Sequence, residues 1–217
     1  MHYPINEIFQ TIQGEGYYTG TPSIFIRLQG CPVHCHWCDT KYTWMCSDKD
    51  NVSIKEVINK NQASKKWSLI NIHDILKIFK KWTAKHVVIS GGEPCLYNLW
   101  NITNTLETEG YQCQIETSGI QNIICSCNTW ITLSPKQNIQ PLNKSIIRAN
   151  EIKFPIFKKE DLLYVNNILS NIKDRKQRII SLQPVSQNQE ALNVCMNACI
   201  KNNWKLSVQL HKYLNVQ

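Results

Sequence analysis

The sequence holds no apolar run that approaches the roughly 20 residues of a membrane-spanning helix. Its first residues, MHYPINEIF, lack the charged and apolar regions of a secretory signal, so we expect a cytoplasmic protein. Repeats, low-complexity tracts and Gly/Ser linkers are also missing, which favours one domain over residues 1–217. With 42% hydrophobic and 18% charged residues, a disordered or collagen-like chain is excluded as well.

Acidic residues are few: 16 Asp and Glu stand against 24 Lys and Arg, a net charge of +8. That balance favours anionic partners, and small phosphorylated or carboxylated molecules satisfy it as well as nucleic acid does. The basic residues form no dense stripe, and the seven Trp are dispersed. We therefore expect a small-molecule substrate, and neither a nucleic acid nor a membrane as partner.

Ten cysteines stand out against these absences. In a reducing cytosol, clustered cysteines bind metal or do redox chemistry more often than they form disulfides. Three of them, Cys31, Cys35 and Cys38, follow the spacing C-x3-C-x2-C. Three thiolates can hold three irons of a [4Fe-4S] cluster and leave the fourth iron open to a substrate or cofactor. The spacing therefore predicts a cluster loop over residues 31–38.

Two other interpretations of this loop stay open on spacing alone. The three cysteines with His34 or His36 could form a structural zinc site, although no second C-x-x-C or H-x-x-x-H supplies distant ligands. Cys35 and Cys38 could instead form a thioredoxin-like redox pair. The remaining seven cysteines show no partner pattern, and we interpret them as structural: Cys46, Cys95, Cys113, Cys125, Cys127, Cys195 and Cys199.

Periodicity divides the chain into three parts. Residues 1–22 are Gly-rich with little periodicity, so we expect a loop there that contacts substrate. Apolar alternation predicts a strand at 23–29, and the polar segment 41–72 looks like an insertion with a short helix near 53–60. Beyond it, we expect strands at 86–90, 112–116, 129–134, 150–154, 178–183 and 205–210, and helices at 73–82, 97–109, 160–172 and 188–201.

Alternating strands and helices predict an α/β fold built on a mostly parallel sheet. About six parallel strands are too few for an eight-stranded barrel, so we expect an incomplete TIM-like barrel with flanking helices. In that architecture ligands bind at the carboxyl ends of the strands. The loops expected to converge there are the cluster loop, GGEP at 91–94, and the segments 117–119, 134–136 and 183–184.

The cysteine spacing is the signature of radical S-adenosylmethionine (radical SAM) enzymes, and the similarity to one family is closer still. The stretch NEIFQTIQGEGYYTGTPSIFIRLQGCPVHCHWCDTKYTW resembles the 7-carboxy-7-deazaguanine synthase family of queuosine and 7-deazapurine biosynthesis. HVVISGGEPC, QIETSG, TWITLSPK, RANEIKFP, LQPVSQ and LSVQLHKYLN resemble it too, in order and over nearly the whole chain. Segment 45–72 is the least diagnostic part.

This resemblance implies a carbon–nitrogen lyase. Such an enzyme converts 6-carboxy-5,6,7,8-tetrahydropterin to 7-carboxy-7-deazaguanine by radical ring contraction with loss of ammonia. The resemblance also implies the incomplete barrel, SAM as a regenerated radical initiator, assistance by Mg²⁺, and a homodimer. An electron donor such as flavodoxin or ferredoxin would reduce the [4Fe-4S] cluster.

By the same resemblance, Cys31, Cys35 and Cys38 ligate the cluster and Thr40 ligates Mg²⁺. A hydroxyl is a weak sole protein ligand for this hard cation, so binding should depend on substrate oxygens. A helix cap is the alternative interpretation of Thr40 and of Asp39.

The SAM site follows the later strands. Two adjacent glycines let backbone come close to a ligand, and the Glu93 carboxylate suits an ammonium group. Trp37 either shields the cluster or contacts adenine, and Lys136 has the alternative of a solvated surface lysine. The residues that the resemblance assigns to SAM are Trp37, Gly92, Glu93, Ser134, Pro135, Lys136 and Gln183.

The substrate site must bind a flat pterin ring and one carboxylate. The fork of Arg27 matches a carboxylate with two hydrogen bonds, against the alternative of a surface arginine. Glu116 and Ser90 lie at the ends of strands on the face where we expect the site. The alternative interpretation of Glu116 is a salt bridge at the end of its strand, and that of Ser90 is a serine in a turn. His211 either closes the pocket or packs the tail. The expected catalytic residues are Arg27 and Glu116, and the expected substrate-binding residues are Ile12, Gln13, Gly14, Glu15, Arg27 and Ser90.

Two other functions fit part of the pattern. A glycyl-radical activating enzyme shares the cysteine spacing but acts on a protein glycine, and the Gln-rich amino-terminal block and SPK favour the deazapurine family over it. A zinc-binding nucleic-acid module would contain zinc and no iron, and its binding would depend steeply on salt.

Overall fold

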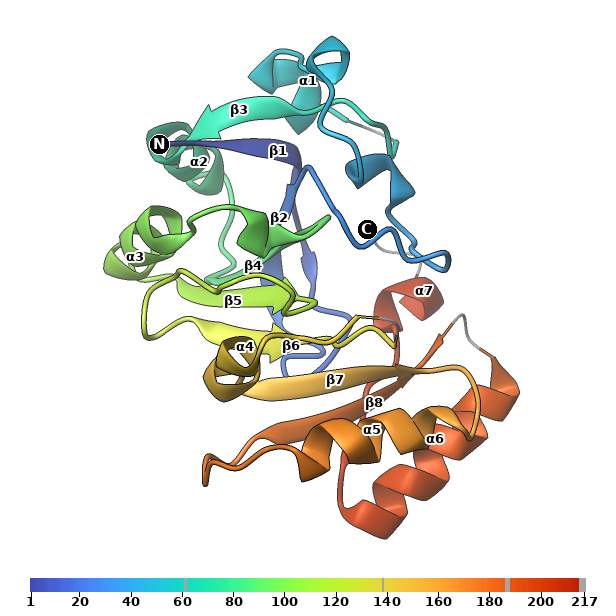
Figure 1. The fold of residues 1–217 in the computed structure, drawn as a ribbon. Coiled ribbons are helices and arrows are strands. Elements are labelled where there is room, and N and C mark those ends of the chain that lie inside the picture. Colours follow the sequence, from blue (N-terminus) through green and yellow to red (C-terminus); the bar gives the residue numbers. More distant parts are fainter. Residues whose placement is uncertain (61, 138, 186–187, 215–217) are drawn as a thin grey trace.

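The structure is a computed structural model that describes residues 1–60, 62–137, 139–185 and 188–214. Over these residues the strands form one open sheet, and Figure 1 shows it running from the top of the molecule to the bottom. In spatial order the strands are β3 (Ser68–Asn71), β1 (His2–Ile12), β2 (Pro22–Leu28), β4 (His86–Gly91), β5 (Gln112–Thr117), β6 (Trp130–Leu133), β7 (Glu151–Ile156), β8 (Ile179–Pro184) and β9 (Lys205–Leu206).

The sheet is mostly parallel. Each neighbouring pair from β2 through β4 to β9 runs parallel, whereas β1 pairs antiparallel with both β2 and β3. The predicted α/β class and the open, incomplete closure are therefore confirmed. Because parallel strands point the same way, the loops that follow them emerge at one edge of the sheet.

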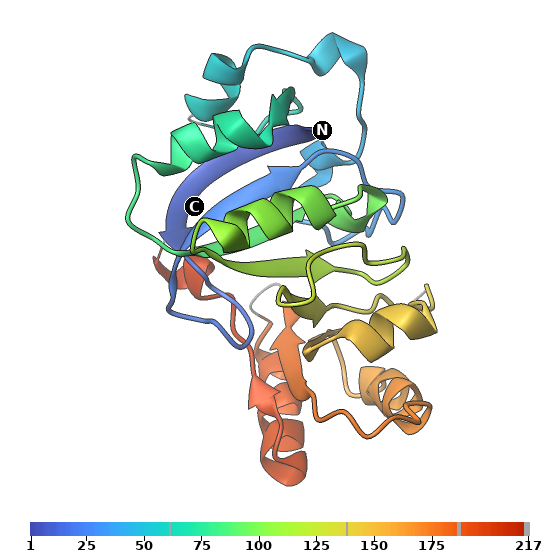
Figure 2. The same ribbon diagram turned by 90° about the vertical axis from the view of Figure 1, so that its left-hand side faces the viewer.

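Except for the last one, Leu210–Leu214, which lies against the loop after β1, the helices connect the strands and lie along the outer side of the curved sheet, as the two perpendicular views in Figures 1 and 2 show. Their starts carry sequence signals: Asn71 caps one helix by accepting from the Asp74 N–H, and Asn188 caps another by accepting from the Ala191 N–H. The helices are α1 (Ile54–Ile58), α2 (Ile72–Phe79), α3 (Trp100–Thr108), α4 (Asn143–Arg148), α5 (Asp161–Ser170), α6 (Gln189–Asn202) and α7 (Leu210–Leu214).

Alternate residues of the central strands face two different layers. On β5, Cys113 and Ile115 join the apolar core that includes Ile102 of α3. The residues that alternate with them, Gln114 and Glu116, face the inside of the curve and hydrogen-bond to each other. The apolar layer holds the helices to the sheet, and the polar layer leaves hydrogen-bonding groups in the interior. None of the described helices is both long and apolar enough to cross a membrane.

Most of the expected elements are present within a few residues of their predicted limits, but four strands and helices of the structure were not predicted: β1, β3, α4 and α7. The expected loop at 1–22 holds β1, because a register shift between Ile5 and Glu7 breaks the period of two that signals a strand. The segment 41–72, expected to be an insertion with one short helix, also contains β3. The residues of α4 show no clear helical periodicity in the sequence. The strand expected at 205–210 is present only over its first two residues, as β9, and the chain then turns into α7, which begins at Leu210. The ends of LQPVSQ and LSVQLHKYLN lie outside the described residues.

Candidate active site

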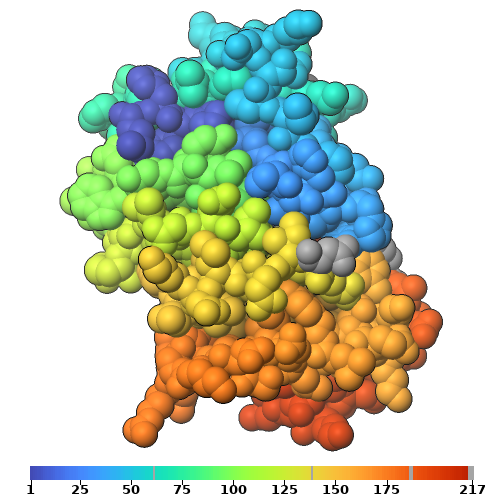
Figure 3. Space-filling view, in the orientation of Figure 1, coloured from blue at the N-terminus to red at the C-terminus, as the bar shows by residue number. Residues whose placement is uncertain are grey.

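Two adjoining cavities lie at the carboxyl ends of the strands. The first, of about 250 Å³, is lined by residues that follow β2, β4, β5, β6 and β8, so the expected convergence of these loops is confirmed. The second, of about 390 Å³, lies toward the loop after β1. On the surface the blue segment after β2 and the yellow segment after β6 meet beside this site (Figure 3). The two cavities share Glu15, Arg27, Asp39, Thr40, Ser90, Glu116, Gln209 and Lys212.

The cluster loop begins at a sharp turn and folds over the first cavity. Gly30, at a φ of +97°, turns the chain out of β2, and its N–H donates to the Thr43 carbonyl at 2.7 Å. A second turn is closed by the Cys38 N–H, which donates to the Cys35 carbonyl at 3.0 Å. As a result Cys31, Cys35 and Cys38 all line the same cavity.

These thiols fit an iron–sulfur cluster in kind and in setting. Three cysteines border one cavity, and thiolates are the ligands of such clusters. Burial raises the pKa of the Cys31 and Cys35 thiols, while the Lys136 ammonium favours the thiolate of Cys35. Within the described ranges, no three His, Cys, Asp or Glu side chains converge where a single metal ion could sit.

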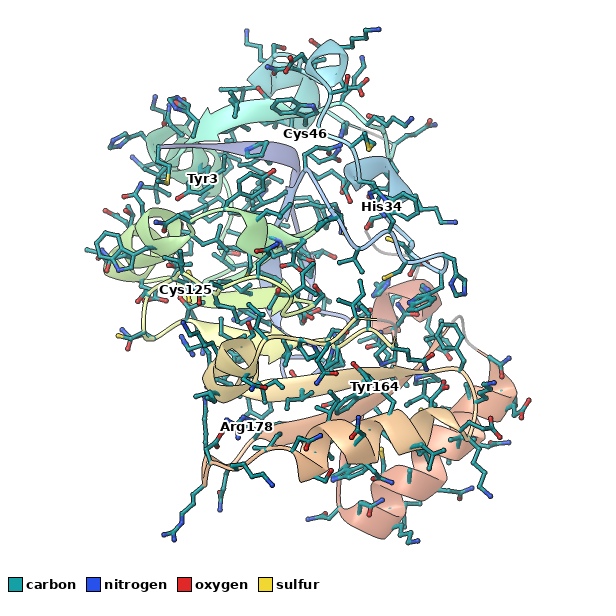
Figure 4. The ribbon with its side chains drawn as sticks, viewed as in Figure 1. Tyr3, His34, Cys46, Cys125, Tyr164 and Arg178 are labelled. Carbon is teal, nitrogen blue, oxygen red and sulfur yellow. The ribbon has the colours of Figure 1, made fainter. Side chains whose placement is uncertain are left out.

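The two histidines of the loop have other neighbours. His34, labelled in Figure 4, stacks on the Trp44 ring with centroids 4.7 Å apart. His36 packs edge-on against Trp37 at 4.4 Å. Neither histidine is among the residues that line either cavity in the described part of the chain, so a zinc site built from them gains no support. Figure 4 also shows Cys125 at the opposite ends of the strands from this loop.

The glycines of GGEP pack against the base of the cluster loop. A Cβ at Gly92 would lie 2.1 Å from the Gly30 carbonyl oxygen and 2.9 Å from Cβ of Cys31. The Gly92 N–H also donates to the Leu28 carbonyl at 3.0 Å. Gly92 is therefore required by the close contact between two loops of the chain itself. From the sequence we had expected glycine here because a ligand comes close to the backbone.

Glu93 is a buried anchor as well as a lining residue, with 1% of its surface exposed. Its Oε1 accepts from the Cys95 N–H at 3.0 Å and from Thr117 Oγ1 at 2.5 Å. Its Oε2 accepts from the N–H of Ser118 at 2.9 Å and from the hydroxyl of the same residue. Three of these donors, the Thr117 hydroxyl and the N–H and hydroxyl of Ser118, tie the loop after β4 to the end of β5, and the Cys95 N–H closes a turn within that loop.

Of the remaining residues expected at SAM, all but one line the first cavity. Lys136 Nζ donates to Ser134 Oγ at 2.9 Å, and burial lowers the pKa of this lysine. It is mostly buried, so the alternative of a solvated surface lysine is wrong. Gln183 lines the cavity and accepts from the Ser207 hydroxyl at 2.9 Å, whereas Pro135 is buried and lines neither cavity in the described ranges.

Trp37 lines the first cavity from its outer side. Its ring packs edge-on against Phe157, with centroids 4.9 Å apart and planes at 74°. This contact links the cluster loop to the residue that follows β7. Both interpretations of Trp37, a shield and a contact for a flat ring, remain consistent with this position.

Thr40 and Asp39 directly follow the third cysteine and line both cavities. Thr40 precedes the short 3-10 helix Lys41–Thr43, but its side chain makes no capping hydrogen bond. Its hydroxyl instead lies 3.5 Å from Cys38 Sγ. Asp39 forms an ion pair with Lys212 of α7 at 2.9 Å. The cap interpretation of Thr40 is therefore wrong.

Arg27 reaches both cavities from β2 and is held in place by a partner that sequence reasoning missed. Glu7 lies opposite Arg27 on β1 and accepts from its Nε at 2.6 Å. Tyr42 Oη donates to the same Glu7 oxygen at 3.2 Å. Glu7 thus fixes the guanidinium through Nε, and among the described residues no hydrogen bond occupies its two Nη groups. The surface interpretation of Arg27 is wrong.

Glu15 and Glu116 share one buried ammonium. Lys153 Nζ, on β7, donates to Glu15 Oε2 at 2.6 Å and to Glu116 Oε2 at 2.9 Å. All three side chains line the first cavity. The Lys153 side chain is 4% exposed, so both ion pairs are largely removed from solvent. The geometry joins the loop after β1, β5 and β7 at the floor of the site.

The two carboxyls of this trio titrate very differently. Burial raises the pKa of Glu116 to about 7, with Lys153 opposing the rise and Glu15 adding to it. Burial acts the same way on Glu15, but Lys153 and a hydrogen bond from Gln209 outweigh it and bring its pKa down to about 2. Burial would lower the pKa of Lys153, yet the surrounding carboxylates raise it. Near neutral pH, Glu116 is the member of the trio that can exchange a proton.

The loop after β1 forms the wall of the second cavity. Ile12, Gln13 and Gly14 line it, and Ser90 at the end of β4 lines both cavities. His211 of α7 lies against Gly14, where an added Cβ would be 2.5 Å from its Nδ1. The adjacent Leu210 N–H donates to the Gly14 carbonyl at 2.9 Å. His211 therefore faces the second cavity rather than packing only as a tail.

Sequence reasoning missed Glu7, Lys153 and Gln209. A lysine within the apolar strand pattern of RANEIKFP was a usable signal, because a buried charge needs a partner of opposite sign. Glu7 lay in a segment interpreted as a loop, so its pairing with β2 was not visible. Gln209 lay in the expected last strand, and nothing in the pattern indicated that the chain turns back to the loop after β1.

The chain is similar to a family model and to known proteins over most or all of its length. The model of a family described as a 4Fe-4S single cluster domain matches residues 12–154. The 7-carboxy-7-deazaguanine synthase of Buchnera aphidicola subsp. Schizaphis graminum is 65% identical over 219 residues, which cover 100% of both chains. The Escherichia coli K12 protein of the same name is 49% identical over 222 residues, again covering 100% of both.

The fold comparison agrees with these sequences. The crystal structure of QueE from Escherichia coli superimposes with a TM-score of 0.94 at 48% identity, over 97% of this chain and 95% of that one. The 7-carboxy-7-deazaguanine synthase of Flavobacterium psychrophilum is more distant, with 35% identity over 98% of this chain and 92% of the relative.

Proposed function

Because the chain belongs to the 7-carboxy-7-deazaguanine synthase family of radical SAM enzymes with a 4Fe-4S domain, we propose how its two cavities perform the family's reaction. The substrate is 6-carboxy-5,6,7,8-tetrahydropterin, and the product is 7-carboxy-7-deazaguanine with loss of ammonia. The first cavity takes the cofactors and the second takes the pterin. The observation that carries this division is that the two cavities adjoin through Arg27, Thr40 and Glu116.

Cys31, Cys35 and Cys38 would hold a [4Fe-4S] cluster, which with bound SAM would supply the one-electron radical chemistry of the reaction. The chain's own contribution here is placement and exclusion of water. Trp37 lines the cavity and packs against Phe157, and the packing of Gly92 on the base of the cluster loop fixes the position of the first cysteine.

The SAM site is formed by Trp37, Gly92, Glu93, Ser134, Pro135, Lys136 and Gln183. Lys136 provides a buried positive charge for a carboxylate, and Ser134 orients its ammonium. Glu93 accepts four hydrogen bonds from the chain, so it shapes the backbone of its loop in addition to lending negative charge to an ammonium group. Pro135 contributes by fixing the backbone between its two neighbours, since it is buried.

The pterin carboxylate binds to Arg27. Glu7 holds Nε of this arginine, which leaves the two Nη groups to form the paired hydrogen bonds of a guanidinium–carboxylate contact. Ser90 lies beside it, and Ile12, Gln13 and Gly14 present backbone and side-chain groups to the polar edge of the pterin, with Glu15 beneath. Thr40 contributes a hydroxyl to Mg²⁺, with substrate oxygens completing the site.

Glu116 moves a proton during the ring contraction. Its pKa of about 7 lets both protonation states be populated near neutrality, as general acid–base catalysis requires. Lys153 stays charged and keeps Glu15 ionised, so the proton is exchanged at Glu116 rather than at its neighbour.

We further propose a single radical SAM core over residues 1–217 that works as a homodimer in the cytoplasm, where its cysteines stay reduced. Residues 1–22 carry the substrate loop and 41–72 an insertion. An acidic electron donor such as flavodoxin or ferredoxin reduces the cluster, and no nucleic acid or membrane is needed as partner. The basic balance of the chain, +8, supports attraction of an anionic substrate and donor.

An anaerobic assay tests the proposed function. The reconstituted protein, with iron and sulfide content confirmed, receives reductant, SAM, Mg²⁺ and 6-carboxytetrahydropterin, and mass spectrometry follows the pterin. We expect a product with the mass of 7-carboxy-7-deazaguanine. An iron-loaded protein that cleaves SAM and leaves the pterin unchanged would refute the substrate assignment.

A further inference from the structure

A chain of hydrogen bonds runs from the site through the interior of the sheet to His86. Gln114, fully buried on β5, is its central member. Its Nε2 donates to Glu116 Oε1 and to Thr132 Oγ1, each at 3.0 Å. Its Oε1 accepts from Gln13 Nε2 at 3.3 Å and lies 2.8 Å from Nε2 of His86. The hydrogen-bonding capacity of this amide is fully used.

The direction of the Gln114 amide decides whether a hydrogen-bond donor or an acceptor faces Glu116. Turning the amide by 180° would exchange its oxygen and nitrogen, and would place an acceptor against a carboxylate that is itself an acceptor. With the nitrogen toward Glu116, the oxygen faces His86, so the histidine must donate from Nε2.

The state of His86 fits this requirement. The ring is 3% exposed, and burial lowers the pKa of His86, which favours the neutral form with a single ring proton. Its Nδ1 is buried without a hydrogen bond among the described residues, although the Gln112 side chain lies beside the ring and, with Gln114, opposes the fall in the pKa of His86. The Tyr18 ring, with its centroid 4.3 Å from that of His86, restricts the imidazole.

We propose that His86 is a positioning residue that acts through Gln114. The Nε2–H of His86, by the shorter of the two contacts to Gln114 Oε1, fixes the direction of the Gln114 amide together with Gln13 Nε2, and the amide then holds Oε1 of Glu116 with a donated hydrogen bond. His86 lies at the amino end of β4, away from both cavities, and touches neither cofactor nor substrate. The catalytic consequence rests on the proposed role of Glu116, but the hydrogen-bond direction does not.

Loss of the His86 donor should raise the titration midpoint of Glu116. A donated hydrogen bond stabilises the carboxylate, and a reversed amide would repel it. The charged groups that face Glu116, namely Lys153, Glu15, Glu151 and Arg27, remain in place when His86 is changed. The change therefore isolates the contribution of the amide.

The first test reads the tautomer in the unaltered protein. ¹⁵N NMR of histidine-labelled, cluster-loaded protein reports which ring nitrogen carries the proton, and His86→Gln identifies the signal. We expect a neutral ring with the proton on Nε2. A proton on Nδ1 alone would reverse the Gln114 amide and overturn the proposal, whatever the outcome of the activity assay.

The second test compares His86→Leu with His86→Gln, which restores a donor at a similar reach. ¹³C NMR of glutamate-labelled protein, assigned by Glu116→Gln, follows the Glu116 carboxyl with pH and needs no turnover. We expect the leucine variant to titrate about one pH unit higher than the parent, and the glutamine variant to stay close to it. In the activity assay, kcat of the leucine variant should change more than KM. Equal titration of both variants and the parent would refute the proposal.

Discussion

Replacement of Lys153 by methionine tests the buried trio at the floor of the site. The substitution keeps an unbranched side chain of similar length but removes the charge that two carboxylates share at 2.6 and 2.9 Å. Removing one partner of a buried ion pair costs about 3–5 kcal/mol, because it leaves an uncompensated buried charge. We expect a loss of that order at pH 8, measured by anaerobic chemical unfolding of the cluster-loaded protein. Lys77→Met, at a lysine that is 73% exposed, is the matched control and should leave stability unchanged.

The two carboxyls make the stability of the folded protein depend on pH in opposite directions. In the parent, the pKa of Glu15 is lowered to about 2, so its contribution to stability is present above its usual value of 4.5 and is lost as pH falls toward 2. The pKa of Glu116 is raised to about 7, so its ionisation reduces stability as pH rises from 4.5 through 7.

Without Lys153 both carboxyls should take up protons more readily. The deficit of the methionine variant should therefore shrink when the pH is lowered from 8 to 5. Adding Glu15→Gln and Glu116→Gln to the methionine variant should recover much of the lost stability at pH 8, because no charge is then left unpaired. A methionine variant as stable as the parent at pH 8, or a deficit that does not depend on pH, would refute the reasoning.

Three further predictions concern the ligands. Cys38→Ala should lose most bound iron and the cluster's absorbance, whereas Cys46→Ala, at an exposed cysteine outside the cluster loop, should keep both; equal iron in the two variants would contradict the assignment. Arg27→Lys should lower kcat/KM for the pterin roughly 100-fold, since loss of a paired charge-assisted contact costs about 2–3 kcal/mol, and a change of less than threefold would count against a carboxylate contact. Thr40→Val should raise the Mg²⁺ concentration needed for half-maximal rate while iron content stays constant; an unchanged Mg²⁺ response would remove Thr40 from that site.

The sequence predicts the parts of the site that follow strands well. Cys31 and Gly92 come just after strands with a clear apolar pattern, and Gln183 lies at the carboxyl end of another. Parallel strands bring these ends together whatever the connecting helices do. The fold class follows from the same alternation. The motifs also carry a family resemblance, which the comparisons bear out over the whole chain.

Other parts depend on tertiary contacts that no local pattern encodes. The register shift in β1 hid both a strand and Glu7, the residue that orients Arg27. The ion pairs of Lys153 join segments that are 37 and 138 residues apart in sequence. The glycines of GGEP were expected, but the reason for them is the contact of Gly92 with the cluster loop, which only the folded chain reveals.

We propose that one site of this protein holds cluster, SAM and pterin together, so that SAM initiates the reaction and is regenerated. The most direct measurement is the ratio of 7-carboxy-7-deazaguanine formed to 5′-deoxyadenosine and methionine released, in one anaerobic reaction with limiting SAM. We predict many product molecules for each SAM that is lost. Stoichiometric loss of SAM without pterin conversion would contradict the account and would favour an enzyme that activates a glycine in another protein.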